Sequence, residues 1–213
     1  MPTHSGPTPS AARRLTRPLS FLLCLLVFSF PLSGQNTALT LPRNLLQLVD
    51  ESDLIVQGRV TTVSLERDEQ LGNLMTVAVT LEVEDSLKGT ATSVHTFRQV
   101  AIDRRDQQQL LGYRPGQHVL LLLIRPSVYG LSSPAGMQQG RFSLRTLPDK
   151  SLEAVNGFSN GGLFRGIETQ LAARGVQMQP EVRAMISQAI PAPAPLKELK
   201  SLIRAIAIPH QVQ

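Results

Sequence analysis

Residues 76–87 read TVAVTLEVEDSL and carry the clearest structural pattern of the chain. Within them, four apolar residues alternate with small, polar or acidic ones: Val77, Val79, Leu81 and Val83. A period of two predicts a β-strand with one face buried and the other in water. The Lys88-Gly89 pair that follows predicts a turn, so the strand is expected to end there.

Four further segments carry strand patterns. Segment 54–63 is rich in β-branched residues and has Gly58 in its middle, which predicts a bulge or a bend. Segment 118–124 is apolar from Val119 onward, which predicts a strand buried on both faces. Segments 94–100 and 141–147 complete the set. Five strands joined by long loops predict a mainly β fold, namely a five-stranded OB-type barrel with C-terminal helices.

Helical patterns flank the strands. One helix is expected after Pro42, and others are expected over 166–174, 181–189 and 196–206. The last helix either packs its apolar side on the rest of the chain or lies on a membrane surface, and its few cations favour packing. The predicted organisation is a signal peptide over 1–34, a β-barrel domain over 35–147, a loop and helical extension over 148–190, and a Pro-rich spacer with an amphipathic helix over 191–213.

The first residues follow the order of a secretory signal peptide. Arg13, Arg14 and Arg17 precede an apolar block over 21–30, and the helix-breaking residues 31–34 come after it. Cleavage is expected near Gly34, which predicts a secreted or periplasmic protein. The alternative is an uncleaved anchor, but the block is shorter than the about 20 apolar residues that a membrane-spanning helix needs. No stable membrane insertion is therefore expected after cleavage.

Removal of the signal peptide changes the charge of the chain. It takes three of the 21 basic residues, so 18 remain against 16 acidic residues and the net charge falls from +5 to +2. No dense basic patch is present, which argues against nucleic-acid binding. The single cysteine, Cys24, lies within the signal peptide. The mature chain is therefore expected to have no disulfide, no thiolate nucleophile and no cysteine-ligated metal.

Candidate catalytic residues are isolated. His95 and His118 lack the spacing of a metal site, so a structural role is expected for both. Glu82 and Glu84, about 7 Å apart on one strand face, fit a solvent-exposed face better than paired catalysis. Ser132 lacks the strand–turn–helix frame of a nucleophile elbow. The sequence therefore predicts a protein that is not an enzyme and needs no cofactor or metal.

The loop over 126–140 is the best candidate for a binding surface. It is long and nearly uncharged, and loops longer than about 12 residues are often functional. An ordered cover over one end of the barrel is the alternative. Arg141 and Arg98 are candidates for a cationic rim beside this loop, although the sequence alone does not place them together. The predicted partner-binding residues are Tyr129, Leu131, Met137, Gln138, Gln139 and Arg141.

Four segments together resemble a known module: 52–60, 77–84, 86–89 and 115–121. They share an opening Asp before an apolar strand, a long second strand that ends in Lys-Gly, and a glycine turn into an apolar fourth strand. In this they are similar to the netrin-like module, the OB-type barrel of the tissue inhibitors of metalloproteinases. The whole chain also resembles exported bacterial proteins of unassigned function.

The resemblance implies a binding barrel and leaves the mechanism of those inhibitors unsupported. They chelate the zinc of the protease through an N-terminal cysteine, and here cleavage after Gly34 exposes Gln35, which tends to cyclise. The expected function is an exported, non-catalytic binding module that contacts an unknown protein partner through the loop after the fourth strand. The alternatives are a structural envelope protein and, by fold analogy only, a protease inhibitor.

Cleavage is open to direct measurement. We expect the full-length chain, expressed in a bacterium that exports it, to yield a mature protein that begins near Gln35. Intact-mass spectrometry checks this and also detects cyclisation of an N-terminal glutamine. A purified protein that retains residues 1–34 would contradict the signal peptide and favour the anchor.

Overall fold

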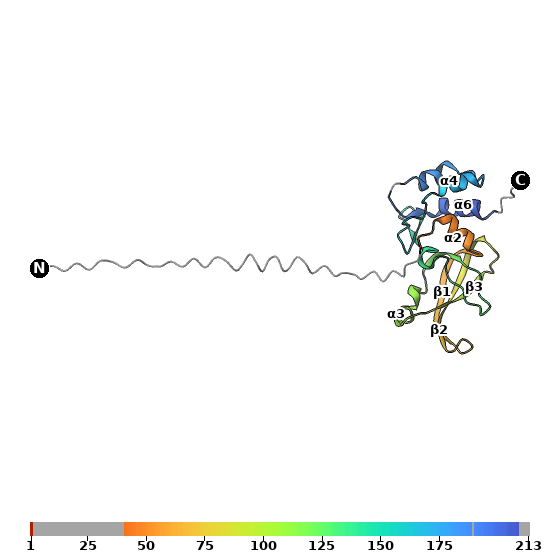
Figure 1. Cartoon of the computed structure of the whole chain (residues 1–213), viewed down its shortest axis with the longest axis vertical. Helices are drawn as coiled ribbons and strands as arrows, with labels where there is room; N and C mark the ends of the chain where they lie inside the picture. Colours follow the sequence, from red (N-terminus) through yellow and green to blue (C-terminus); the bar gives the residue numbers. More distant parts are fainter. Residues whose placement is uncertain (2–40, 189, 209–213) are drawn as a thin grey trace. The chain divides into compact units, whose positions relative to one another are not determined.

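The computed structural model describes residues 41–188 and 190–208, together with Met1. Apart from Met1, the predicted signal peptide over 1–34 lies outside the described residues. The described residues from Leu41 to Ile208 belong to one compact unit. Figure 1 shows the helices α2, α4 and α6 of this unit at the end opposite the turn between β1 and β2.

One antiparallel sheet organises the unit. Its strand order is β3-β2-β1-β4-β5-β6-β7, and every neighbouring pair is antiparallel. The strands are β1 (Leu54–Asp68), β2 (Leu74–Lys88), β3 (Val94–Val100), β4 (His118–Leu123), β5 (Arg141–Thr146), β6 (Leu152–Asn156) and β7 (Ala194–Pro195).

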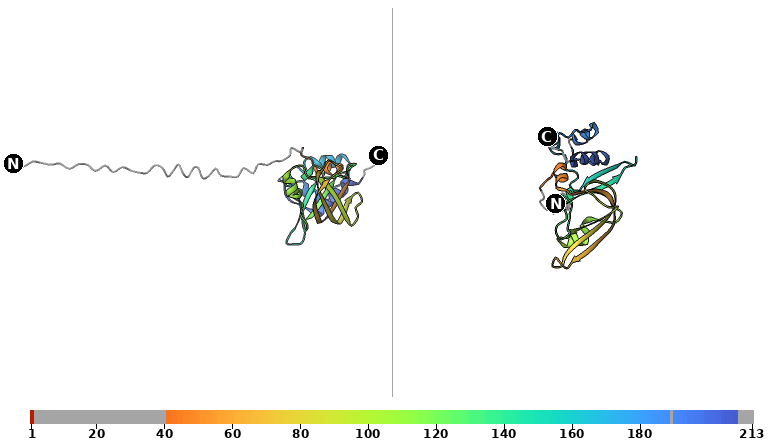
Figure 2. Two further views of the ribbon diagram at one scale, coloured as in Figure 1. Left: turned by 90° about the horizontal axis from the view of Figure 1, so that it is seen from below. Right: turned by 90° about the vertical axis from the view of Figure 1, so that its right-hand side faces the viewer.

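The mainly β fold is confirmed, but the five-stranded barrel is wrong. Seven strands form the sheet, and its end strands β3 and β7 do not pair with each other. The reason is that β6 occupies the outer edge of β5, and β7 in turn covers the edge of β6. The edge that a closing strand pair would need is therefore already hydrogen-bonded. The sheet still curves strongly, as the right-hand view of Figure 2 shows.

Five α-helices accompany the sheet in the described residues. They are α2 (Leu45–Glu51), α3 (Arg104–Gln108), α4 (Ile167–Ala173), α5 (Pro180–Ile186) and α6 (Leu196–Ala207). A capping box starts α2: Asn44 Oδ1 accepts from Gln47 N, and Gln47 Oε1 accepts from Asn44 N. The helices predicted after Pro42 and over 196–206 are both present, as α2 and α6. Among the described helices, none is long and apolar enough to cross a membrane.

Two hydrophobic cores lie on the two faces of β4. Leu120 and Leu122 enter the first core, which also contains α2, α4, α5, α6 and parts of β5 and β6. Val119, Leu121 and Leu123 enter the second core, which lies between β1, β2, β3 and Tyr113. The prediction that segment 118–124 is buried on both faces is confirmed. The apolar side of α6 is buried in the first core, so this helix packs as expected.

A β-bulge interrupts the pairing of β1 with β2 at Gly58, as the sequence predicted. Gln57 pairs with Asp85 and Gly58 pairs with Val83, which leaves Glu84 as the extra residue. Beyond the bulge, the alternating side chains of β2 point to the opposite face of the sheet. Val83, before the bulge, packs on the second core, whereas Leu87, after it, belongs to the first. The predicted alternation over 76–87 therefore holds only as far as Val83.

Gly58 is expected to tolerate no side chain. A Cβ built there would overlap the backbone carbonyl oxygen of Glu82, which the sheet holds in place. We predict that Gly58→Ala lowers the free energy of unfolding by about 1–3 kcal/mol, as overpacking does elsewhere. Chemical denaturation measures this, with Thr62→Ala at an exposed position of β1 as the control that changes it by under about 0.5 kcal/mol. Equal effects of both substitutions would contradict the prediction.

Candidate functional site

The loop over 126–140 begins with a tight turn over 127–131. Ser127 N donates to Leu131 O at 2.8 Å, and Gly130 N donates to Ser127 O at 2.9 Å. The hydroxyl oxygen of Ser127 also accepts from Tyr129 N and Leu131 N, at 3.3 and 3.2 Å. These four bonds use most of the backbone donors of the turn and fix its shape.

This turn displays two apolar side chains to solvent. Val128 is 95% exposed and Tyr129 is 63% exposed, although both are residue types that gain from burial. We call this pair the Val128–Tyr129 tip. Single exposed apolar residues are common, but an adjacent aliphatic and aromatic pair on a hydrogen-bonded turn forms a small projecting hydrophobic surface.

The part of the loop after the tip is anchored to the sheet. Leu131 forms a parallel bridge with Arg98 on β3, where Ser132 N donates to Arg98 O at 2.8 Å. The Ser132 hydroxyl donates to Ile124 O at 2.7 Å, and Ile124 N donates to Ser133 O at 3.0 Å. Leu131 is half-buried as a result. The anchor lies immediately beside the tip, so the tip has little freedom to move relative to the sheet.

Met137 and Gln138 are exposed but lie elsewhere. They belong to a short 3-10 turn, Met137–Gln139, and Gln138 O accepts a bond from Gly157 N just after β6. A Cβ placed on nearby Gly136 would lie 3.2 Å from the side chain of Leu48 in α2. The loop thus runs from the edge of β3 to the side of α2 and β6. The six predicted partner-binding residues do not form one continuous surface.

Gln139 serves the fold and offers no surface. It is 3% exposed, its Oε1 accepts from Arg43 N at 2.7 Å, and its Nε2 donates to Leu41 O at 3.2 Å. Both ends of its amide therefore hold the segment that leads into α2. A partner would have to displace this segment to reach Gln139, so this residue is removed from the candidate surface.

Arg141 is also internal, and it does not form a rim with Arg98. Its guanidinium stacks 3.7 Å from the ring centroid of Tyr113 and donates to Leu111 O and Gly112 O at 2.7 and 2.6 Å. Arg98 pairs instead with Glu66, at 3.1 Å. Burial lowers the pKa of Arg141, while the neighbouring Tyr113 opposes this shift.

Tyr113 lies in the second core with its ring edge against Phe97, at a centroid distance of 5.8 Å. Burial raises the pKa of Tyr113 to about 12, and the charge of Arg141 acts in the opposite direction. Its hydroxyl has no hydrogen-bond partner among the described residues. The Arg141–Tyr113 pair therefore fixes the 110–113 turn over the core.

A polar cluster lies at the bulge, built on Gln57, Glu84 and His118. His118 Nε2 lies 2.6 Å from Glu84 Oε2 and 3.0 Å from Gln57 Nε2, and Gln57 Nε2 donates to Glu84 at 2.8 Å. One ring nitrogen cannot both donate to Glu84 and accept from Gln57, so the short contact to Glu84 marks it as the donor. The bulge, which makes Glu84 the extra residue, brings this carboxylate against His118.

A second set of ionic contacts continues from Gln57 to α6. Lys200 Nζ donates to Gln57 Oε1 at 2.6 Å and forms an ion pair with Asp85. Arg204, one turn further along α6, donates to the same oxygen of Asp85 at 2.6 Å. Burial raises the pKa of Asp85, but the hydrogen bonds and charges of Lys200 and Arg204 outweigh it and hold the pKa below its ordinary value. Asp85 therefore ties the helix to the sheet.

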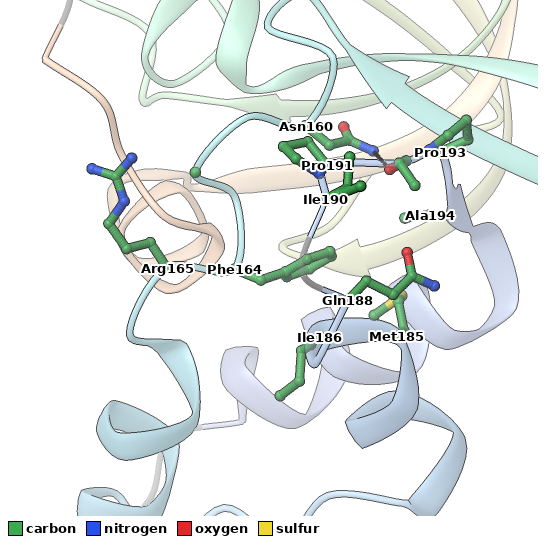
Figure 3. Close-up of a pocket in the computed structure, with 12 residues that line it drawn as sticks. Asn160, Phe164, Arg165, Met185, Ile186, Gln188, Ile190, Pro191, Pro193 and Ala194 are labelled. Atoms are coloured by element: carbon green, nitrogen blue, oxygen red, sulfur yellow. Dashed lines mark hydrogen bonds between the residues drawn. The ribbon is translucent and has the colours of Figure 1, made fainter.

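A separate hollow of about 230 Å³ lies between the 160–165 segment, α5 and the 190–194 segment. Figure 3 shows Phe164, Met185 and Ile186 around it, while the guanidinium of Arg165 points away. Asn160 spans one side and donates to Ala192 O at 2.9 Å. The hollow offers apolar contact without converging ionisable groups.

The histidines and carboxylates make no metal-binding set within the part of the chain that the structure describes, where no three of them converge. Burial lowers the pKa of His95, which is half-buried on β3. Comparison of the chain with protein-family models, curated proteins and solved structures finds no match. The netrin-like resemblance accordingly stays a prediction.

The sequence reasoning missed Val128 and the role of Ser127. A serine followed three residues later by glycine is a turn signal, and it would have indicated that residues 128 and 129 lie at a loop apex. It also missed the cluster around Gln57, because no local pattern shows that Lys200, 143 residues away, is its partner.

The Asp85 contacts predict a pH-dependent stability. The pKa of the carboxyl is lower in the folded than in the unfolded chain, so its contribution is complete above the ordinary pKa of 3.8 and is lost as pH falls through the folded pKa. We expect Asp85→Asn to lower the free energy of unfolding by about 1–2 kcal/mol at pH 7, where Lys200 and Arg204 lose the carboxylate that they share. This deficit should shrink below about pH 4.

Urea denaturation at pH 7 and pH 3 measures the deficit. The matched control is Asp53→Asn, whose ion pair with the largely exposed Arg125 is expected to contribute under about 0.5 kcal/mol. A deficit for Asp85→Asn that stays constant from pH 7 to pH 3 would contradict the assignment.

Proposed function

We propose that the protein is an exported, non-catalytic binding module that contacts a protein partner through the Val128–Tyr129 tip. The observation that carries this proposal is the exposure of both side chains on a turn whose backbone is already hydrogen-bonded. An ordered turn loses little conformational entropy on binding, so more of the hydrophobic gain remains as affinity. Tyrosine is among the residues that most often dominate binding energy at interfaces.

Leu131, Met137 and Gln138 have supporting roles in this proposal. Leu131 anchors the tip to β3, whereas Met137 and Gln138 supply a separate exposed area near α2. The tip is convex, so the matching surface of the partner is an apolar pocket that receives a tyrosine ring. The netrin-like resemblance makes a secreted protease the first partner class to try, by a contact other than zinc chelation.

The proposal is tested by comparing two double-serine variants of the protein, purified after expression of the full-length chain. Val128→Ser/Tyr129→Ser removes the tip, and Leu41→Ser/Ile208→Ser removes two exposed apolar residues outside it, which are 80% and 60% exposed. Both variants are expected to keep the thermal stability of the wild type, because neither pair is buried. Partners are captured from the envelope and secreted fractions and then purified for titration.

We expect the tip variant to lose at least about tenfold in affinity for a purified partner, while the control variant binds as the wild type does. Calorimetric titration of each variant measures this. Equal binding by both variants contradicts the role of the tip. If no partner is retained by the wild type, the structural envelope protein becomes the better interpretation.

A further inference from the structure

A groove of about 590 Å³ lies between the turn of the β5–β6 hairpin and the start of α6. Lys150 and Leu152 line one side, and Leu196, Lys197 and Lys200 line the other. Its volume falls in the range of small-molecule sites, roughly 300–1,000 Å³. The groove shares no residue with the Val128–Tyr129 tip, so a role for it does not depend on the proposed function.

The charge of the groove is predominantly positive. Four cations line it, Lys150, Lys197, Lys200 and Arg204, against one carboxylate, Glu198. Lys200 and Arg204 share the single carboxylate of Asp85, so this trio keeps a surplus positive charge. Lys150 and Lys197 form no ion pair within the described residues. An anion entering the groove therefore meets uncompensated positive charge.

Lys200, which lines the groove, is held in position by hydrogen bonds. Its ammonium donates to Gln57 Oε1 and to Asp85, and its side chain is only 18% exposed. Gln57 is itself fixed, because its Nε2 donates to Glu84. An ammonium has three donors, so one N–H of Lys200 has no assigned acceptor. A donor that is already oriented binds an anion without first losing side-chain entropy.

The groove also has apolar walls. Leu152 is only partly buried against the first core and supplies most of this wall, whereas Leu196, which lines the groove from the first turn of α6, is itself largely buried in that core. A fully hydrated inorganic anion would leave the exposed part of Leu152 in water. An anion with an apolar body would cover this part and gain from the area removed from water.

We propose that this groove binds a small organic anion, with a carboxylate or phosphate head near Lys200, Lys150 and Lys197 and an apolar body against Leu152, beside the start of α6. The charge surplus selects the sign of the ligand, the oriented ammonium fixes its head, and the walls select an amphipathic body. The solvated face of an ordinary surface helix would show the cations alone, without a concave apolar wall.

Four probes test the proposal by NMR titration of the ¹⁵N-labelled protein. Octanoate and octyl phosphate carry both features, acetate has only the charged head, and 1-octanol has only the apolar body. Octanoate or octyl phosphate is expected to shift the backbone amides of residues 150–152 and 196–200 in a saturable way. The tighter of these two probes identifies the preferred head group. Acetate and 1-octanol are expected to bind at least about fivefold more weakly.

A pair of variants with equal charge change tests the role of the cations. Lys150→Gln/Lys197→Gln removes two rim cations, and Arg104→Gln/Arg114→Gln removes two exposed cations outside the groove. The rim variant is expected to weaken octanoate or octyl phosphate binding by roughly three- to tenfold at low ionic strength, and the control variant to leave it unchanged. All four residues lie on exposed turns or helix ends, so folding is expected to be preserved.

Three results would overturn the proposal. The first is the absence of saturable shifts at residues 150–152 and 196–200 with either amphipathic anion. The second is binding of 1-octanol as tight as that of octanoate, because the groove would then be merely apolar. The third is equal weakening by the two double variants, which would show a general charge effect. None of these results bears on the tip, whose test uses a different surface.

Discussion

The alternation of side chains along β4 is the constraint on which the two cores depend. Leu120 and Leu122 point into the first core, and Val119, Leu121 and Leu123 point into the second. A strand alternates its faces at every residue, so a shift of β4 by one position would exchange the contents of both cores at once. This fixes the register of β4 against β1 and β5. It also fixes Ile124, from which the loop that carries the Val128–Tyr129 tip begins.

The bulge at Gly58 keeps a carboxylate of β2 out of the second core. Val77 to Val83 face the second core at every other position, and simple alternation would place Asp85 there as well. An unpaired carboxylate in an apolar core is costly, and such groups are normally paired or excluded. The extra residue, Glu84, directs Asp85 to the opposite face, where Lys200 and Arg204 meet it. The same displacement brings Glu84 against His118, so one backbone irregularity creates both polar contacts.

The features that the sequence predicted correctly are those that short stretches of sequence determine. The two-sided burial of segment 118–124, the helix after Pro42, the bulge at Gly58 and the packing of the last helix all follow from periodicity or single-residue conformational preference. The barrel prediction was wrong because β6 and β7 are short. In the sequence, Pro191–Pro195 has the composition of a spacer, and only its pairing with β6 shows that it contains a strand. Gln139 and Arg141 look like surface residues in the sequence, but they bond to Leu41 and Leu111, whose proximity only the complete fold supplies.

The tip and the groove are different in kind and are held by different parts of the fold. The tip is convex and apolar and is held by the edge of β3, whereas the groove is concave and cationic and lies against the first core. Hydrogen-bonded strands connect the two surfaces: Leu131 bridges to β3, β3 pairs with β2, and Asp85 of β2 contacts Lys200 in the groove. Coupling also requires an element with two alternative arrangements. Connection through the sheet is therefore not by itself evidence of coupling between the two surfaces.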